Sequence, residues 1–165
     1  MELMEIVNAS RETIIKHFSL GSEAKELKLE SGESFLTYDE ESILYLFNAR
    51  YEYLSGVVLK GEEAPVSVFG VRVGMGVNEA RSFLLMFGFK ERDRNPVSNG
   101  SQECLFLDAT FVPDYYDPAA EYEVDPIEYY TVVLSYKHED AMVSDVIALS
   151  GYWAHVQEEL LPLLD

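Results

Sequence analysis

The stretch from Val68 to Phe89 most constrains the fold of this chain, because a short apolar run meets two glycines there and then a helical pattern. Gly74 and Gly76 interrupt an extended run and permit backbone conformations that other residues avoid. Asn78 follows as a favourable N-cap, and Glu79 lies in the first turn, where the helix dipole favours a negative charge. The sequence therefore predicts a helix that begins at this point.

Apolar residues recur at helical spacing through this central helix. Its inward face is predicted to hold Ala80, Phe83, Leu84 and Phe87, widened by Leu85 and Met86. So wide a face predicts a helix that is covered on most sides, with Phe83 and Phe87 buried and Gly88 just past its end. A phosphate-binding loop is the alternative interpretation of the glycines. The sequence lacks the Walker lysine and the third glycine of the dinucleotide fingerprint, so a core helix is favoured.

Length and charge limit the classes of function. A chain of 165 residues, 48% of them hydrophobic, can bury a real core as one compact unit. Thirty acidic and 12 basic residues give a net charge of −18, which repels nucleic acid and anionic membrane surfaces. A charged partner is therefore expected to be a basic protein. No run approaches the roughly 20 apolar residues of a membrane span. Without a visible signal sequence we expect a cytoplasmic protein, or an extracytoplasmic one if a signal has been removed.

Before the central helix, the sequence predicts a helix and then a meander of strands. The helix is expected within residues 2–18 and is closed by Gly21. Leu27 and Leu29 alternate with charged residues in the hinge that follows, which indicates a short edge strand. Antiparallel strands are then expected at Phe35–Tyr38, Ser42–Phe47 and Tyr51–Lys60.

After the central helix, the same order of elements returns. A polar, turn-rich segment at residues 90–102 precedes strands expected at Cys104–Val112, Tyr129–Tyr136 and Met142–Leu149. A closing helix is expected at Tyr152–Leu161, with Trp153, Val156 and Leu160 on its apolar face.

The two series predict an α+β protein of two fused repeats, each a helical N-terminal segment followed by about three antiparallel strands. The expected bounds are residues 1–61 for the first repeat, 66–151 for the second and 152–165 for the C-terminal helix. Gly61–Pro65 would connect the two repeats within one compact unit.

A family resemblance rests on the central stretch. Its residues are Val71 at a strand end, Gly74 and Met75 as a pair, Glu79 and Ala80 in the helix, and Gly88 as the closing glycine. This arrangement resembles the helix-plus-sheet repeat of β-lactamase-inhibitor-like proteins and of the SmpA/OmlA outer-membrane lipoprotein family. The resemblance implies a non-catalytic α+β fold that binds other proteins across a concave sheet.

Catalytic and metal-binding patterns are not found in the sequence. His17, His138 and His155 are far apart, and Cys104, the one cysteine, is expected to be a buried strand thiol. We therefore expect a protein that is not an enzyme, with no cofactor and no resident metal. A small hydrolase that uses an acidic pair is an alternative; it would require two carboxylates that face each other in a concave pocket.

The segment Pro113–Tyr130 holds five tyrosines, six carboxylates and three prolines between two predicted strands. Long loops of this kind tend to be functional or disordered, and tyrosine offers a large contact area at small entropic cost. Three interpretations stay open: a solvated crossing loop whose tyrosines pack on the sheet, a protein-binding loop, and a calcium site. The calcium ligands would be Asp114, Asp117, Glu121 and Asp125.

As a binding loop, this segment would contact the partner through Tyr115, Tyr116, Asp117, Glu121, Tyr122 and Glu123, with the three tyrosines as anchors. Tyr129 and Tyr130 belong to the next strand, and alternation predicts that one of them points into the core. We expect a non-enzymatic protein-binding module that engages a basic protein. A toxin-immunity-type inhibitor in the cytoplasm is the alternative.

Overall fold

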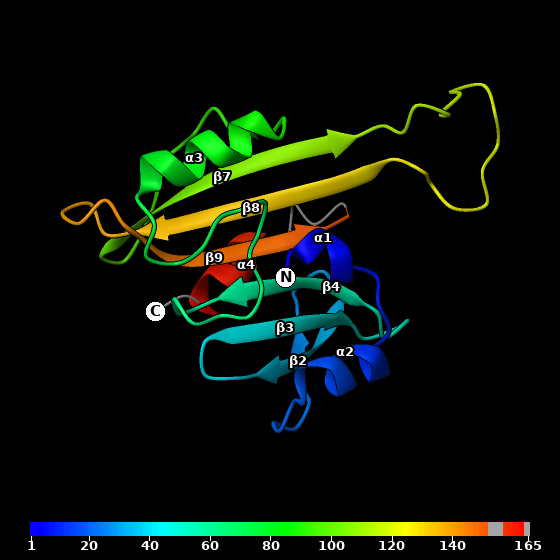
Figure 1. Cartoon of the computed structure of the whole chain (residues 1–165), viewed down its shortest axis with the longest axis horizontal. Helices are drawn as coiled ribbons and strands as arrows, with labels where there is room; N and C mark the ends of the chain where they lie inside the picture. The colour runs from blue at the N-terminus through cyan, green and yellow to red at the C-terminus, as the bar shows by residue number, and fades with distance from the viewer. Residues whose placement is uncertain (152–156, 164–165) are drawn as a thin grey trace.

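A computed structural model describes residues 1–151 and 157–163 and confirms an α+β protein, organised around one nine-stranded antiparallel sheet (Figure 1). The helices are α1 (Leu3–Ile6), α2 (Arg11–Phe18), α3 (Val77–Met86) and α4 (Gln157–Leu160), and the 3-10 helix is η1 (Leu161–Leu163). The strands are β1 (Lys25–Lys28), β2 (Ser34–Asp39), β3 (Ile43–Asn48), β4 (Leu54–Leu59), β5 (Lys90–Glu91), β6 (Val97–Asn99), β7 (Gln102–Phe111), β8 (Glu128–Tyr136) and β9 (Val143–Ser150).

The strands follow the order β1-β2-β3-β4-β9-β8-β7-β5, and β6 also pairs with β7. The first four strands form the expected meander, and the expected strands after the central helix are β7, β8 and β9. The two meanders meet where β4 pairs with β9, from Gly56 opposite Leu149 to Leu59 opposite Val146. One sheet therefore runs through the whole protein.

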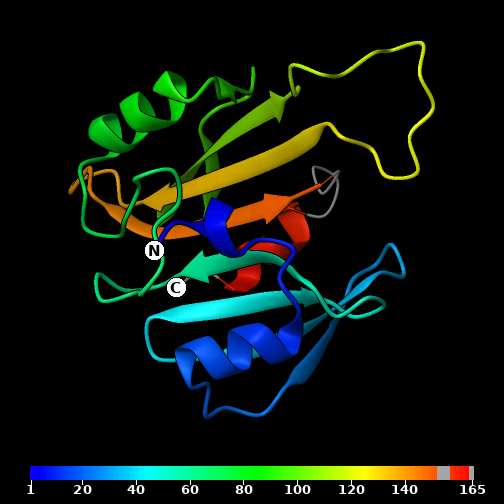
Figure 2. The same cartoon turned by 45° about the vertical axis from the view of Figure 1, so that its right-hand side comes forward.

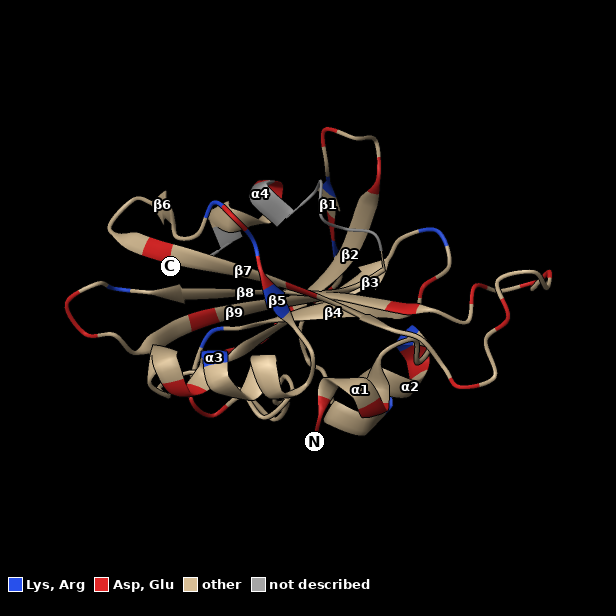
Figure 3. Cartoon of the chain, turned by 90° about the horizontal axis from the view of Figure 1, so that it is seen from above, with Lys and Arg blue, Asp and Glu red and all other residues tan. Residues whose placement is uncertain are grey.

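Different elements cover the two faces of the sheet (Figure 3). Helices α1, α2 and α3 lie on the first face, where Leu3, Ile14 and Leu84 join the larger buried cluster. On the second face, Leu160 and Leu161 of the C-terminal segment pack in a smaller cluster with residues such as Phe35 and Phe106. The closing helix expected at Tyr152–Leu161 is described only from Gln157; Trp153 and Val156 lie outside the described residues.

Helical structure forms within residues 2–18 as expected, but as two helices, because the chain breaks between α1 and α2. Asn8 adopts a left-handed backbone with φ of 70°, and its amide donates to the Leu54 carbonyl at 2.8 Å. Ser10 then caps α2 by accepting the Thr13 amide at 3.2 Å. Ser19, with φ of 52°, ends α2 in place of Gly21.

Helix α3 forms where it was expected, but it is covered on one side only. Gly76 is the N-cap instead of Asn78, and Gly88 with φ of 95° follows the helix as predicted. Its buried residues are Val77, Ala80 and Leu84. The prediction that Phe87 is buried is wrong, since it is 44% exposed, and Phe83 is only half-buried; Leu85 and Met86 are exposed as well. The helix therefore packs on the sheet through one side, and Leu85 and Met86 on its last turn face solvent.

A tight turn precedes α3 and carries Phe69, whose ring contacts several others and forms with them an aromatic centre. Its other members are Phe87, Phe89, Phe111 and Tyr130. Val68 and Val71 exchange both backbone hydrogen bonds across Phe69 and Gly70, which both have positive φ. The Glu2 carboxylate accepts the amides of Phe69 and Gly70, each at 2.8 Å. The first residues of the chain therefore hold this turn, and the Phe69 ring points into the core with 1% of its surface exposed.

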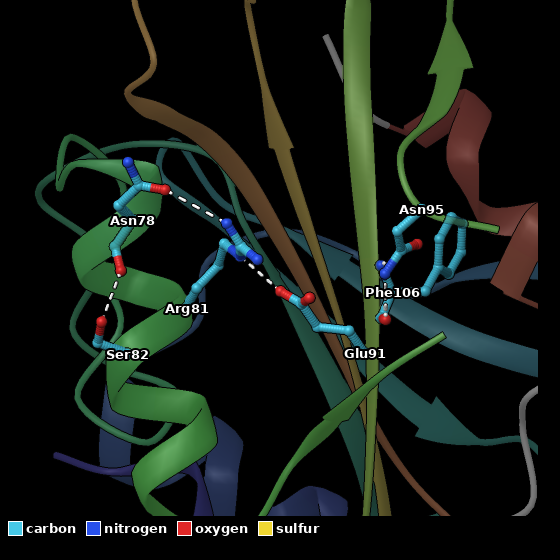
Figure 4. Close-up of polar contacts among 6 residues, drawn as sticks. All are labelled: Asn78, Arg81, Ser82, Glu91, Asn95 and Phe106. Atoms are coloured by element: carbon cyan, nitrogen blue, oxygen red, sulfur yellow. Dashed lines mark hydrogen bonds and ion pairs between the residues drawn. The ribbon is translucent and has the colours of Figure 1, made fainter. Parts of the chain in front are cut away.

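The segment at residues 90–102, expected to be an irregular hinge, instead forms β5 and β6 along the outer side of β7. Between these short strands, the Asn95 side chain donates to the Phe106 carbonyl at 2.8 Å and accepts the Phe106 amide at 3.1 Å (Figure 4). The side chain thus replaces a strand residue at the sheet edge. Arg81 of α3 donates to Glu91 of β5 at 2.5 Å, which ties the helix to the same edge.

Candidate functional site

A long loop, residues 112–127, joins β7 to β8 and projects beyond the ends of both strands (Figures 1 and 2). Nine consecutive residue pairs connect the two strands, from Glu103 opposite Tyr136 to Phe111 opposite Glu128. This pairing fixes both ends of the loop. Acidic residues follow each other along it without a lysine or arginine (Figure 3).

Local contacts give the projecting loop an internal structure. The ring of Tyr116 stacks on that of Tyr122, with centroids 5.7 Å apart, and the Tyr122 hydroxyl accepts the Asp117 amide at 2.8 Å. The Asp117 carboxylate accepts the Ala119 amide at 2.9 Å. Farther along, Asp125 accepts the Ile127 amide at 3.0 Å. The two aspartates form turns of the kind that this residue favours.

The six residues proposed for partner contact therefore divide into three groups. Tyr115 is 71% exposed and carries no stacking contact among the described residues, so its side chain is available to a partner. Tyr116 and Tyr122 contact each other and support the loop. Asp117, Glu121 and Glu123 are exposed. Of the two strand tyrosines, Tyr130 is buried at 3% exposure and Tyr129 is half-buried, which confirms the alternation.

Val124 belongs to the same surface, although its sequence position alone gave no signal for it. Its side chain is 80% exposed, the largest fraction of any large apolar side chain in the described part of the protein. Val124 lies between Glu123 and Asp125, and a partner that covers it would remove apolar surface from water, which favours binding.

A cavity of about 590 Å³ lies at the base of the loop. Tyr115 and residues 124–127 line it from the loop, while Tyr53, Asn8 and Glu33 line it from the body of the protein. These residues come from widely separated parts of the chain, so no local pattern marks them. The cavity has the size range of a ligand-binding pocket.

The calcium interpretation gains no support from the geometry. In residues 1–151 and 157–163, no three histidine, cysteine or acidic side chains form a group that could hold a metal ion. Asp114, Asp117, Glu121 and Asp125 therefore do not form such a group either. His17 lies in the last turn of α2 and His138 in the turn between β8 and β9, while His155 lies outside the described residues.

A row of polar residues crosses β7, β8 and β9 in the interior. Cys104 lies opposite Ser135, and Ser135 lies opposite Asp145. Each of the three is at most 1% exposed, and burial raises the pKa of the Cys104 thiol. The Ser135 hydroxyl donates to Gln102. These groups are closed off from solvent, and Cys104 is the buried strand thiol that was expected.

Asp108 and Glu40, in the part of the chain that the structure describes, have lowered pKa values. Burial alone would raise the pKa of Asp108, but hydrogen bonds from Arg92 and Thr131 outweigh it and hold the pKa below its usual value. The amide and hydroxyl of Ser22 lower the pKa of Glu40. Both shifts favour the charged form, whereas a general acid requires the opposite shift.

The stability of the protein is expected to fall between pH 10 and pH 12. Burial, together with the charges of Glu40 and Glu128 respectively, raises the pKa of Tyr45 and of Tyr130 to about 12, while in the unfolded chain each ionises near 10. The stabilisation is complete below pH 10 and is lost as the pH rises toward 12, at about 1.4 kcal/mol per pKa unit. Urea unfolding across this range should therefore show a smaller loss for Tyr130→Phe. An equal loss in variant and parent would contradict the assignment.

None of the helices in residues 1–151 and 157–163 has the length and apolar character to cross a membrane. Comparison of the whole chain with known proteins gives no match to a protein family, to a curated protein or to a solved structure.

Proposed function

We propose that this protein is a non-enzymatic protein-binding module whose acidic, tyrosine-rich loop, residues 112–127, binds a basic protein. The observation that carries the proposal is the exposure of Tyr115 and Val124 on a loop that projects from two firmly paired strands. Large apolar and aromatic surfaces that a protein leaves in water at such a position are typical of interaction sites.

Tyr115 is the proposed anchor, and the stacked pair of Tyr116 and Tyr122 positions it. Tyrosine loses little conformational entropy when a partner buries it. A loop that is already held by its own contacts also loses less conformational entropy on binding than a flexible loop does. Asp117, Glu121 and Glu123 are the proposed polar contacts of the rim.

Charge supports a basic partner. No lysine or arginine lies between Arg94 and Lys137, so the loop and both its strands present only negative formal charge. A surface of one sign accelerates encounter with a partner of the opposite sign and disfavours acidic competitors. An immunity-type inhibitor that binds a basic toxin is one form of this function.

The two-repeat architecture is part of the proposal. Its support is the strand order, in which β2-β3-β4 and β7-β8-β9 are both sequential meanders and the last strand of each meets the other at the centre. Superposition of residues 1–61 on residues 66–151 should align these strands and the preceding helices. The relation to β-lactamase-inhibitor-like proteins is proposed on the same basis. Because α4 and η1 lie on the second sheet face, we place the partner on the loop and not across that face.

Replacing Tyr115 by alanine is expected to weaken binding about thirtyfold, the effect of removing an anchor that contributes about 2 kcal/mol. The partner would be recovered from cells of the source organism on immobilised protein, purified, and measured by surface plasmon resonance. Replacing Tyr115, Tyr116 and Tyr122 together should abolish binding. Raised ionic strength should slow association more than it speeds dissociation, since screening acts on encounter.

Met86→Ala is the matched control, because Met86 is 71% exposed, as Tyr115 is, and lies on α3, outside the loop. It should bind as the parent does, and circular dichroism should show the same fold for all variants. Parental affinity in the triple variant would overturn the proposed function.

A further inference from the structure

We propose that the cavity at the base of the loop is the specificity pocket of this interaction and binds one arginine side chain of the partner. This inference rests on the proposed function and names the group that the partner would insert. The cavity is formed by the loop on one side and the body of the protein on the other, so that a partner lying along the loop has direct access to it.

Aromatic rings and carboxylates line the cavity together. The rings are those of Tyr53, Tyr115 and Tyr129, and the carboxylates are those of Glu33, Asp125 and Glu128. No lysine or arginine side chain belongs to the lining that the structure describes. Asp125 and Glu128 form no ion pair with another residue that the structure describes, so their negative charges are available to a cation. The charge of the cavity is therefore complementary to a basic side chain.

Neighbouring arginines of the chain itself are already engaged. Arg11 forms an ion pair with Glu52 at 2.8 Å, and the Arg50 guanidinium lies 5.2 Å from the centre of the Tyr51 ring. Neither arginine pairs with Asp125 or Glu128 of the cavity lining. The contact of Arg50 with Tyr51 also shows, on the same turn, the geometry in which a guanidinium stacks on tyrosine.

Arginine fits this lining better than lysine does. Its planar guanidinium stacks on aromatic faces and presents a fork of donors to carboxylates, whereas an ammonium group is a compact, strongly hydrated charge. A volume of about 590 Å³ also exceeds what a guanidinium alone fills, so that the aliphatic stem and the adjacent backbone can enter. A hydrogen bond within the loop fixes part of the wall, because the Asp125 carboxylate accepts the Ile127 amide at 3.0 Å.

The charge of Glu128 already acts on its surroundings. It adds to burial in raising the pKa of Tyr130, a residue that also lines the cavity. Glu128 begins β8 and pairs with Phe111, so its backbone is held by the sheet and not by the loop alone. A carboxylate whose backbone is held by the sheet at the root of a projecting loop is suited to meet a cation that enters along the loop.

The test is a nuclear magnetic resonance titration of the whole protein with three short peptides. The probes are acetyl-Gly-Arg-Gly-amide and its counterparts with lysine or with citrulline, the neutral isostere of arginine. The arginine peptide should give saturable shifts that are confined to Tyr53, Tyr115, Tyr129 and residues 124–128. The citrulline peptide should give none, and the lysine peptide should bind several-fold more weakly.

Asp125→Asn and Glu128→Gln should each weaken the arginine peptide about tenfold, the effect of losing one hydrogen bond to a charged group. Both substitutions keep the side-chain shape, and the asparagine can still accept the Ile127 amide. Glu139→Gln in the β8–β9 turn removes the same charge far from the cavity in the sequence and is exposed. It should change the affinity less than twofold.

Equal binding of the arginine and lysine peptides would overturn the arginine assignment. Binding of the citrulline peptide, or shifts spread over the acidic surface without saturation, would overturn the pocket altogether. If the peptides fail while Tyr115→Ala still weakens the basic partner, the loop keeps its proposed function and this inference alone is lost.

Discussion

Replacing Phe69 by alanine is expected to lower the free energy of unfolding by about 3 to 5 kcal/mol, the range for deleting a buried aromatic side chain. The Phe69 ring contacts four other aromatic rings, with centroid separations of 5.4 Å to Phe87, 4.9 Å to Phe89, 5.9 Å to Phe111 and 5.3 Å to Tyr130. These rings come from the α3 end, β7 and β8. The substitution therefore leaves a cavity at the point where the central helix meets the sheet.

The backbone of Phe69 allows a sharper version of this experiment. With φ of 51°, the residue occupies a conformation that favours glycine over alanine. At an ordinary buried site glycine is worse than alanine by roughly 0.5 to 1 kcal/mol. Here Phe69→Gly should be no less stable than Phe69→Ala. Urea unfolding of both variants measures this difference directly.

Tyr51→Ala, which removes an exposed aromatic ring, should change the stability by only about 0.5 kcal/mol and serves as the control. A loss below about 1 kcal/mol for Phe69→Ala would mean that the aromatic centre does not hold α3 on the sheet.

Replacing Gly56 by alanine is expected to cost about 3 kcal/mol, the upper end of the usual range for over-packing. A Cβ atom at this position would lie 2.1 Å from the Ala148 carbonyl oxygen and 2.8 Å from a Leu149 methyl carbon. The obstacle is backbone, which cannot rotate away as a flexible side chain can. Strands β4 and β9 would have to move apart at their first residue pair.

Gly21→Ala is the matched control for this prediction, because its added Cβ would meet nothing within 4 Å. It should leave the stability unchanged or raise it by a few tenths of a kcal/mol, about the effect of a less flexible unfolded chain. Thermal unfolding of the two variants separates steric conflict from the general effect of a glycine substitution. Equal melting temperatures would show that β4 and β9 tolerate the extra methyl group.

Local patterns in the sequence predicted the long strands, because buried apolar runs such as those of β3, β7 and β9 are bounded by turn residues. Alternation also placed Tyr130 inside and Tyr129 nearer the surface. The burial of Cys104 followed from the apolar strand around it. In each of these cases the determining neighbours are a few residues away in the chain.

Features set by distant contacts could not be predicted in this way. The break between α1 and α2 depends on hydrogen bonds that Asn8 and Ala9 exchange with Leu54 of β4. Strand β5 is only two residues long. Between β5 and β6, the Asn95 side chain forms the hydrogen bond to the β7 backbone that a strand residue would otherwise form. The apolar width of α3 predicted cover on most sides, whereas Leu85 and Met86 face solvent.

The candidate site also contains one part that the local sequence predicts and one part that depends on distant contacts. Tyr115 and its acidic neighbours could be named because they are contiguous and unusual in composition. The cavity could not, since Asn8, Glu33 and Tyr53 reach it through the fold. The loop can be predicted from its own sequence, whereas the cavity beside it depends on the tertiary structure.

The pairing of β4 with β9 has a consequence for the synthesis of the protein. All six residues of β4 are buried in the finished sheet, and the partner of its second edge is β9, which follows it by more than 80 residues in the chain. A ribosome adds roughly 5 to 20 residues per second, so this edge stays open on the order of several seconds. During translation, the nascent chain thus presents an apolar strand edge of the kind that chaperones shield and that neighbouring nascent chains can pair with.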